Sequence, residues 1–216
     1  MIGMAEIARH SVCRRSLPAI IITFTINVLA SATGRNRMAN AKLKMGYSEY
    51  AEIPDDGKQH EIIDGEHYMN PAPNTYHQTV SRLIQFQLMQ QVEMQKLGVV
   101  YDAPTDVQLS DHDIIQPDLV VVLAENRNII TPIKIKGVPD LVVEILSPST
   151  KKKDIELKHQ LYCRSGIPEY WIVDPDEHLI QQFALVGAEY RLLGSESTAI
   201  SPRIIEGVTV DLTAVW

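Results

Sequence analysis

Two short apolar segments, each carrying one acidic residue, constrain the fold of this chain more than any other feature. Residues 119–123 and 141–146 are rich in Val, Ile and Leu, are too short for typical helices, and are bounded by Pro and polar residues. Such segments are typical of strands covered on both faces of a sheet. Asp118 stands at the start of the first segment and Glu144 lies inside the second. The sequence therefore predicts two central strands that each carry a carboxylate.

A buried carboxylate needs a compensating partner, because removing an unpaired ionised group from water is costly. The 25 residues between Asp118 and Glu144 are enough for a strand, a return loop and a second strand beside the first. We therefore expect the two acids to lie close together. A divalent cation would serve both, since Mg²⁺ is usually held by one or two carboxylates with waters and substrate phosphate.

The motifs around these strands carry a family resemblance. They are Pro117-Asp118, the run Glu144-Ile145-Leu146-Ser147-Pro148-Ser149-Thr150, the pair Asp154 and Lys158, and the run Gly166-Ile167-Pro168-Glu169-Tyr170-Trp171-Ile172-Val173-Asp174. Together they resemble the Uma-type family of restriction endonucleases, a branch of the PD-(D/E)XK nuclease superfamily, over residues 47–216. The resemblance implies metal-dependent hydrolysis of DNA phosphodiester bonds. We expect Asp118, Glu144 and the carbonyl oxygen of Ile145 to hold Mg²⁺ or Mn²⁺.

One position departs from the superfamily pattern, which has Lys two residues after the second acid. That position is Leu146. We take Lys158 as the replacement, because a helix after the second strand can fold its first turns back over the end of that strand, with Asp154 and Lys158 on one face. The alternative is that Asp154 and Lys158 are only a surface helix pair, which stabilises a helix by a few tenths of a kcal/mol.

Two further residues are candidates near the site. Glu61 corresponds to an acid that the resemblance places near the metal, and a cross-strand surface charge is the alternative. His77 lies in the first turn of the longest expected helix, where a single His is either an auxiliary site residue or a structural hydrogen-bonding group. The sequence leaves both alternatives open.

The remaining elements follow from periodicity and turn signals. Asp64-Gly65 predicts a hairpin over residues 60–69, and Asn74 caps a helix over residues 74–96 that Gly98 ends. Further strands are expected at 99–101, 106–109 and 169–173, a loop at 111–113, a helix at 153–164 closed by Gly166, and a closing hairpin at 178–183 and 190–193. The fold class is α/β, with the αβββαβ core of restriction endonucleases, a mixed central sheet and hairpins added at both ends.

Residues 1–37 differ from the rest of the chain. Arg14-Arg15, an apolar stretch over residues 17–29 and Ala30-Ser31-Ala32 imitate a signal peptide. The alternative, which we prefer, is an upstream extension from an over-long gene prediction, with the start at Met38 or Met45. Either reading makes residues 38–216 the single endonuclease-like domain.

Charge limits how this chain can bind nucleic acid. Residues 1–37 hold five Arg and one Glu, which leaves 15 basic and 26 acidic residues and a net charge of −11 for residues 38–216. Affinity for DNA therefore cannot rest on a broad basic face. It must be local, and the dense basic positions are Lys134, Lys136, Lys151, Lys152 and Lys153.

The expected partner is DNA. We expect no membrane association and leave homodimer formation open. Cys13 and Cys163 form no metal or disulfide spacing pattern, which favours a reducing, cytoplasmic location. The competing function class is a non-catalytic protein that keeps the nuclease fold as a binding or assembly module, and both Leu146 and the acidic charge favour it.

Overall fold

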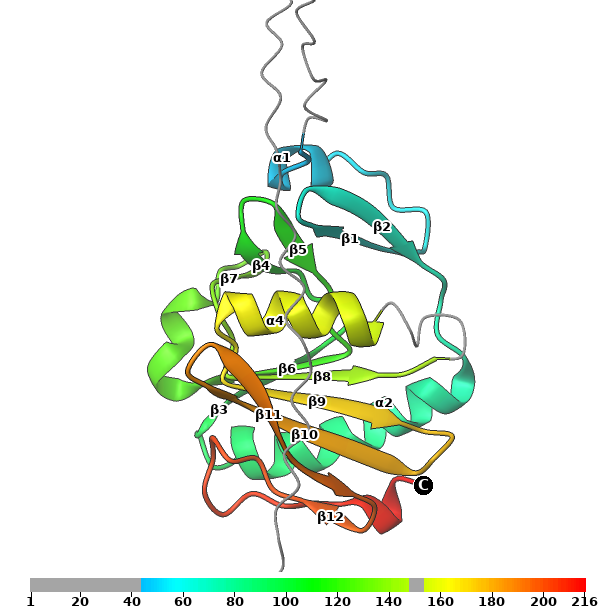
Figure 1. Ribbon diagram of the computed structural model, residues 1–216, viewed down its shortest axis with the longest axis vertical. Helices are drawn as coiled ribbons and strands as arrows, with labels where there is room; N and C mark the ends of the chain where they lie inside the picture. The colour runs from blue at the N-terminus through cyan, green and yellow to red at the C-terminus, as the bar shows by residue number, and fades with distance from the viewer. Residues whose placement is uncertain (1–43, 148–153) are drawn as a thin grey trace, which may run out of the picture. The chain divides into compact units, whose positions relative to one another are not determined.

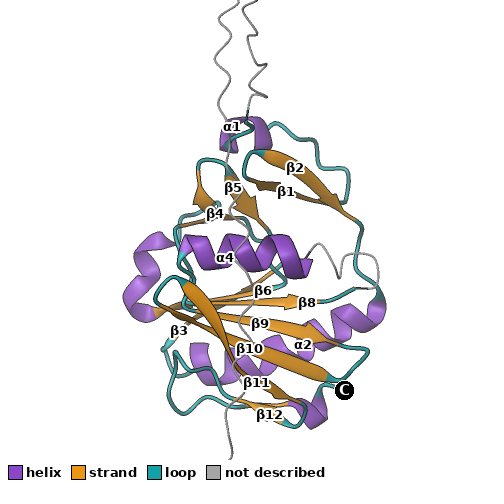
Figure 2. Ribbon diagram, in the orientation of Figure 1, coloured by secondary structure: helices purple, strands orange, loops and turns teal. Residues whose placement is uncertain are grey.

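The computed structural model describes residues 44–147 and 154–216. The signal-like segment 1–37 and the lysines at 151–153 lie outside these residues, as does the side chain of Asp154. Figure 1 shows a central sheet with helices on its two faces and a smaller sheet next to it. Figure 2 distinguishes the helices, strands and loops in the same view.

The central sheet has six strands in the order β11-β10-β9-β8-β6-β3. The pair β8 and β9 is parallel, and every other neighbouring pair is antiparallel, so the sheet is mixed as expected. The strands are β3 (Gly98–Asp102), β6 (Leu119–Leu123), β8 (Leu141–Ile145), β9 (Glu169–Asp174), β10 (Leu179–Val186) and β11 (Glu189–Glu196).

Helices cover the two faces of this sheet (Figure 1). One face carries α2 (Thr75–Leu88), which continues as the π-helical segment η1 (Met89–Glu93). The other carries α4 (His159–Ser165), which follows the π-helical segment η3 (Asp154–Lys158). The order α2, β3, β6, β8, α4, β9 is the predicted αβββαβ core, and β10 and β11 form the predicted closing hairpin.

The alternation of side chains along β6 explains why the strand is apolar throughout. Leu119 and Val121 pack in the same cluster as Val80, Ile84 and Leu88 of α2. Val120 and Val122 point the other way and pack in a cluster with Leu161 and Tyr162 of α4. Because successive strand residues face opposite sides of a sheet, a strand covered on both faces needs an apolar residue at every position.

The smaller sheet has five strands in the order β2-β1-β5-β4-β7. They are β1 (Gln59–Ile63), β2 (Glu66–Asn70), β4 (Val107–Ser110), β5 (Asp113–Ile115) and β7 (Ile135–Lys136), and α1 (Tyr47–Tyr50) precedes them. The β1–β2 hairpin turns at Asp64 and Gly65 with φ of 53° and 77°, as the Asp-Gly signal predicts. The expected loop at residues 111–113 is wrong at its end, because Asp113 begins β5.

The helix that begins at Asn74 ends differently from the prediction. The Asn74 side chain accepts a hydrogen bond from the His77 backbone N–H at 2.8 Å, which confirms the cap. Lys96, with φ of 61°, takes the left-handed conformation after the helix, although we expected Gly98 to end it. Gly98 instead begins β3, where a Cβ atom would lie 2.5 Å from the Val122 carbonyl oxygen. The glycine is needed for close strand packing and not for ending the helix.

The 3₁₀ segment η2 (Ala124–Ile129) follows β6. The C-terminal segment of the chain adds β12 (Ala199–Ile200), β13 (Val210–Asp211) and η4 (Leu212–Ala214). Its apolar residues pack in the main core cluster, and Glu169, whose side chain is fully buried, forms a polar attachment. That carboxylate accepts hydrogen bonds from Trp171 Nε1 at 2.7 Å, Gln182 Nε2 at 2.7 Å and the Ile204 backbone N–H at 3.0 Å. These three donors compensate for the removal of the charge from water.

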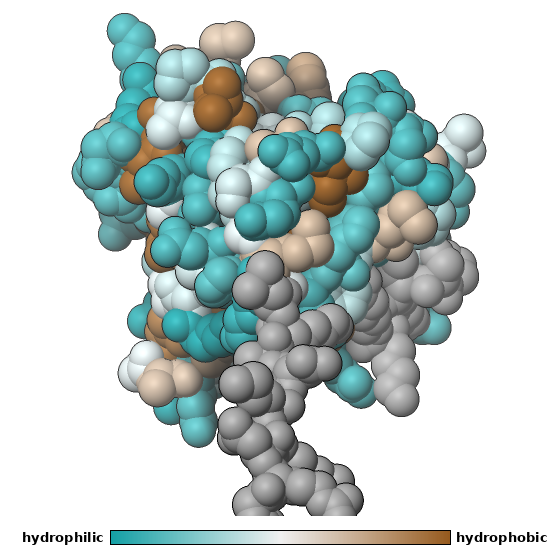
Figure 3. Space-filling model, turned by 90° about the horizontal axis from the view of Figure 1, so that it is seen from above, coloured by the Kyte–Doolittle hydropathy of each residue, from teal (hydrophilic) through white to brown (hydrophobic). Residues whose placement is uncertain are grey.

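The surface and the helices are ordinary for a globular domain. On the face drawn in Figure 3, hydrophobic residues are scattered among hydrophilic ones. None of the helices described is long and apolar enough to span a membrane.

Candidate functional site

A buried lysine links the two sheets. Lys158 Nζ lies 3.0 Å from both carboxylate oxygens of Glu144, and 3.0 Å from Glu61 Oε1. Glu144 comes from β8 of the central sheet, Glu61 from β1 of the smaller sheet, and Lys158 from the end of η3. All three are almost completely buried, with exposures of 4%, 1% and 4%. Two carboxylates therefore share one ammonium group in the interior.

The fold brings each of these residues to the same place for a local reason. Glu144 alternates with Val143 and Ile145, which pack on the α2 side, so its side chain points to the α4 side. Lys158 immediately precedes α4, which covers that face. Glu61 is oriented by Asn70 Nδ2 at 2.8 Å and by the Gln116 backbone N–H at 3.1 Å. Lys158 therefore lies beside Glu144, as predicted from the sequence, while position 146 holds Leu.

Tyr162 completes the surroundings of Glu144. Its hydroxyl donates a short hydrogen bond to Glu144 Oε1, and its side chain is fully buried. Burial first, and then the charge of Glu144, raise the pKa of this hydroxyl well above its usual value, so that it stays a proton donor. Tyr162 lies within the helix predicted over residues 153–164, but its hydroxyl was not among the predicted site groups. Its spacing of four residues from Lys158 was the available signal, because such residues lie on one helix face.

Asp118 lies next to Glu144 in the sheet but has different partners. The register pairs Leu119 with Val143, so continuing it by one residue brings Asp118 opposite Glu144. Asp118 Oδ2 accepts a hydrogen bond from the Ile145 backbone N–H at 2.7 Å. The two acidic strands are therefore neighbours, as the spacing predicted.

His77 contacts two groups that we predicted as metal ligands, the Asp118 carboxylate and the Ile145 carbonyl oxygen. Its Nε2 lies 3.0 Å from the Ile145 carbonyl oxygen and 3.3 Å from Asp118 Oδ2. The side chain reaches this position from the first turn of α2, whose N-terminus the Asn74 cap fixes. Of the two auxiliary candidates, His77 thus contacts the site through its ring, whereas nothing is described of the Asp154 side chain.

A cleft lies against Asp118 and His77. Its volume is about 850 Å³, and its lining comes from both sheets. The central sheet contributes Tyr101 and Asp102 from β3, and the smaller sheet contributes Gln59 and His60 from β1. Glu144 and Lys158 are not among the lining residues. Asp118 is therefore the candidate acid nearest to a space that a ligand can enter.

The donor set fits a hard divalent cation in its chemistry. Asp118, Glu144 and the Ile145 carbonyl supply only oxygen atoms, which Mg²⁺ prefers, and two carboxylates are the usual number. Within residues 44–147 and 154–216, no three His, Cys, Asp or Glu side chains gather into a metal cluster. A site in this part of the chain would therefore need water or substrate oxygen atoms to complete the coordination.

Comparison with known proteins bears on the family and the fold. No curated protein matches the chain. A crystal structure described as a putative nuclease belonging to DUF820 from Anabaena variabilis ATCC 29413 is similar, with a TM-score of 0.66 and 18% identity. The match covers 79% of this chain and 97% of that chain, and at this identity it shows the fold alone.

The family model for Uma2, described as "Putative restriction endonuclease", matches residues 47–213. This range contains every candidate site residue. The chain therefore belongs to the Uma2 family and has the restriction-endonuclease-like fold of the PD-(D/E)XK superfamily.

Proposed function

We propose that this protein is a metal-dependent endonuclease that hydrolyses phosphodiester bonds in DNA. One observation carries the proposal: Lys158 Nζ lies 3.0 Å from the Glu144 carboxylate, although the usual Lys position holds Leu146. An ammonium beside the second acid is the arrangement that the superfamily pattern supplies through its own Lys. The chain thus has an acid pair on adjacent strands and a cation next to it.

In this proposal Asp118, Glu144 and the Ile145 carbonyl oxygen would hold Mg²⁺ or Mn²⁺. The bound ion would polarise a phosphoryl oxygen and lower the pKa of a water molecule. The protein's own residues have separate tasks. Lys158 would stabilise the charge that develops on the phosphate in the transition state. Tyr162 and Glu61 would hold Glu144 and Lys158 in place, and His77 would orient Asp118 and the Ile145 carbonyl.

A non-catalytic nuclease-fold module is the second candidate, and the burial of the cluster favours it. Glu61, Glu144 and Lys158 neutralise one another in part and have almost no exposure. Such a buried ionic group can serve a structural purpose, because it positions the smaller sheet against the central one. The acidic charge of residues 38–216 also opposes general affinity for DNA.

Nicking of supercoiled plasmid DNA separates the two candidates. The endonuclease should nick the plasmid with Mg²⁺ or Mn²⁺, should not do so with EDTA, and should lose activity on Glu144→Gln. Glu156→Gln is the matched control, because Glu156 is an exposed acid in the same η3 segment as Lys158. Nicking that persists at the full rate in Glu144→Gln would refute the assigned site, and absence of nicking by the unaltered protein would favour the module.

A further inference from the structure

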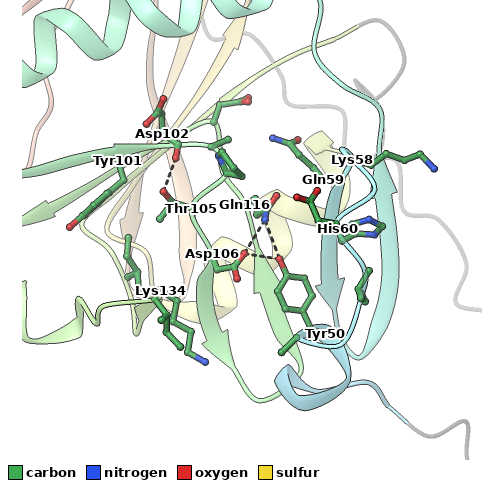
Figure 4. A pocket seen from close by; sticks show the side chains of 18 of the residues that line it. Tyr50, Lys58, Gln59, His60, Tyr101, Asp102, Thr105, Asp106, Gln116 and Lys134 are labelled. Atoms are coloured by element: carbon green, nitrogen blue, oxygen red, sulfur yellow. Dashed lines mark hydrogen bonds between the residues drawn. The ribbon is translucent and has the colours of Figure 1, made fainter.

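The cleft beside Asp118 contains a rigidly held acceptor group that the proposed hydrolysis does not use. Asp106 Oδ1 accepts two hydrogen bonds, from the Tyr50 hydroxyl at 2.6 Å and from Gln116 Nε2 at 2.9 Å. Gln116 Nε2 also lies 3.1 Å from the Tyr50 hydroxyl oxygen, which closes a three-membered network. Figure 4 shows these three side chains meeting in the wall of the cleft.

The network leaves one acceptor, Asp106 Oδ2, and no donor for a ligand. Asp106 Oδ2 takes part in none of these bonds, and Asp106 is only partly buried and lines the cleft. Gln116 Oε1 has no hydrogen-bond partner in the part of the chain that is described, but this atom is buried and out of reach of a ligand. The Tyr50 hydroxyl donates to Asp106, and Gln116 Nε2 donates to Asp106 and to the Tyr50 hydroxyl oxygen, so both donors are used within the network. This wall is therefore built to receive N–H groups.

Charge argues against the phosphate backbone as the occupant of this wall. The cleft is lined by Asp55, Asp102, Asp106 and Asp118, against Lys58 and Lys134. Lys134 is already engaged, because its Nζ lies 2.8 Å from the centroid of the Tyr47 ring. A phosphate would meet more negative than positive charge here.

The rest of the lining suits a flat, partly apolar group. Tyr47, Tyr101, Pro104 and Pro132 line the cleft, and Ile133 at its edge is 72% exposed. Aromatic and apolar side chains of this kind bind unpaired bases by stacking, while a few polar groups read the base edge. The volume of about 850 Å³ lies within the range of small-molecule sites.

We propose that this cleft binds an unpaired nucleobase that bears an exocyclic amino group, such as cytosine. The cytosine N4 amine is a donor that a carboxylate accepts directly, whereas thymine presents a carbonyl at the corresponding position. The base would belong to single-stranded DNA, because its pairing edge must be free to reach Asp106. This inference rests on the proposed function, since it places the base beside the strand to be cleaved at Asp118.

The experiment measures binding without cleavage. Fluorescence anisotropy of the full chain with labelled oligo(dC) and oligo(dT), in EDTA, should show roughly tenfold tighter binding of oligo(dC). A duplex of the same length should bind more weakly than oligo(dC), because its bases are paired. Equal affinity for oligo(dC) and oligo(dT), or tighter binding of the duplex, would overturn the proposal.

A substitution tests whether Asp106 is the reader. Asp106→Asn keeps the shape and one acceptor but turns the second oxygen into a donor, so the preference for dC over dT should disappear or reverse. Asp176→Asn is the matched control, because Asp176 is exposed and lies outside the cleft lining. An Asp106→Asn protein that melts like the unaltered one and keeps the full dC preference would show that another group reads the base. If that variant does not fold, the comparison of oligo(dC) with oligo(dT) on the unaltered protein decides alone.

Failure of this inference is distinguishable from failure of the proposed function. A protein that nicks plasmid DNA but binds oligo(dC) and oligo(dT) equally is an endonuclease without this base site. A protein that prefers oligo(dC) but never nicks DNA has the base site and lacks the hydrolytic activity. Preference for oligo(rC) over oligo(dC) would contradict the assignment to DNA.

Discussion

Lys158 Nζ lies 3.0 Å from both carboxylate oxygens of Glu144, and the same ammonium contacts Glu61 from the other sheet. Removing this one side chain therefore leaves two carboxylates buried side by side without their shared cation. Breaking a buried ion pair by deleting one partner is far more destabilising than the pair itself is stabilising.

Lys158→Ala should lower the free energy of unfolding by about 3 kcal/mol at neutral pH. Chemical denaturation followed by circular dichroism measures this directly. Lys58→Ala is the control, because Lys58 pairs with Asp56 at the surface at 3.1 Å and exposed pairs contribute about 1 kcal/mol or less. Equal effects of the two substitutions would mean that the buried cluster is not formed in solution.

Transferring the lysine back along the chain tests its role in cleavage. Leu146 packs in the same cluster as Val142, Leu161 and Tyr162, so it points to the side of the sheet that Glu144 also faces. Leu146→Lys combined with Lys158→Ala should therefore restore part of the nicking activity that Lys158→Ala removes. Full activity in the Lys158→Ala single variant would instead direct attention to Lys151, Lys152 and Lys153.

Divalent ions should stabilise the folded protein. Mg²⁺ or Mn²⁺ would reduce the repulsion between Asp118 and Glu144, and a ligand that binds only the folded state raises the melting temperature. Differential scanning fluorimetry should show this rise, and Asp118→Asn and Glu144→Gln should each abolish it. An unchanged rise in both variants would place the ion elsewhere.

Tyr162→Phe should destabilise the protein by about 1.5–3 kcal/mol, which is typical of a hydrogen bond to a charged group. The substitution preserves the buried ring and removes only the hydroxyl that donates to Glu144. Tyr76→Phe is the control, because Tyr76 is 40% exposed and makes only long contacts at its hydroxyl. Denaturation curves of the two variants give the comparison.

His159 should make the stability of the fold depend on pH. Its ring packs edge-on against Tyr170, Phe183 and Tyr190, and burial holds its pKa below the usual value. The unfolded chain then binds the proton more readily, so stability is full above about pH 6.5 and falls as the pH drops below it. His159→Gln should flatten this part of the profile, measured as unfolding free energy between about pH 7 and pH 5. His67, whose pKa burial also lowers, should account for the slope that remains.

Local patterns predicted the elements well, because their causes are local. The apolar runs around Asp118 and Glu144, the Asn74 cap and the Asp64-Gly65 turn all act within a few residues of themselves. The assembly of the smaller sheet could not be predicted in the same way, although its hairpin at residues 60–69 and its strand at residues 106–109 were. It forms through pairings such as Ile62 with Ile114, between strands of two to five residues that carry little pattern.

The site was predictable as a set of residues but not as a network. The spacing indicated that Asp118 and Glu144 lie on neighbouring strands, and a family resemblance singled out Glu61. The contact of Glu61 with Lys158 depends on how the two sheets pack, which no local pattern specifies. The Asp106, Gln116 and Tyr50 network was missed for the same reason, because Tyr50 comes from the short helix α1.

The buried carboxylate of Glu169 changes how the run from Gly166 to Asp174 is understood. One of its three donors is the backbone N–H of Ile204, in the last segment of the chain. Shortening the chain before Ile204 would leave the buried Glu169 carboxylate with one donor fewer, and the penalty would fall on the start of β9. The C-terminal segment therefore helps to stabilise β9, the strand that pairs with β8 and its Glu144, so a run that marks the family is also the place where the end of the chain supports the core.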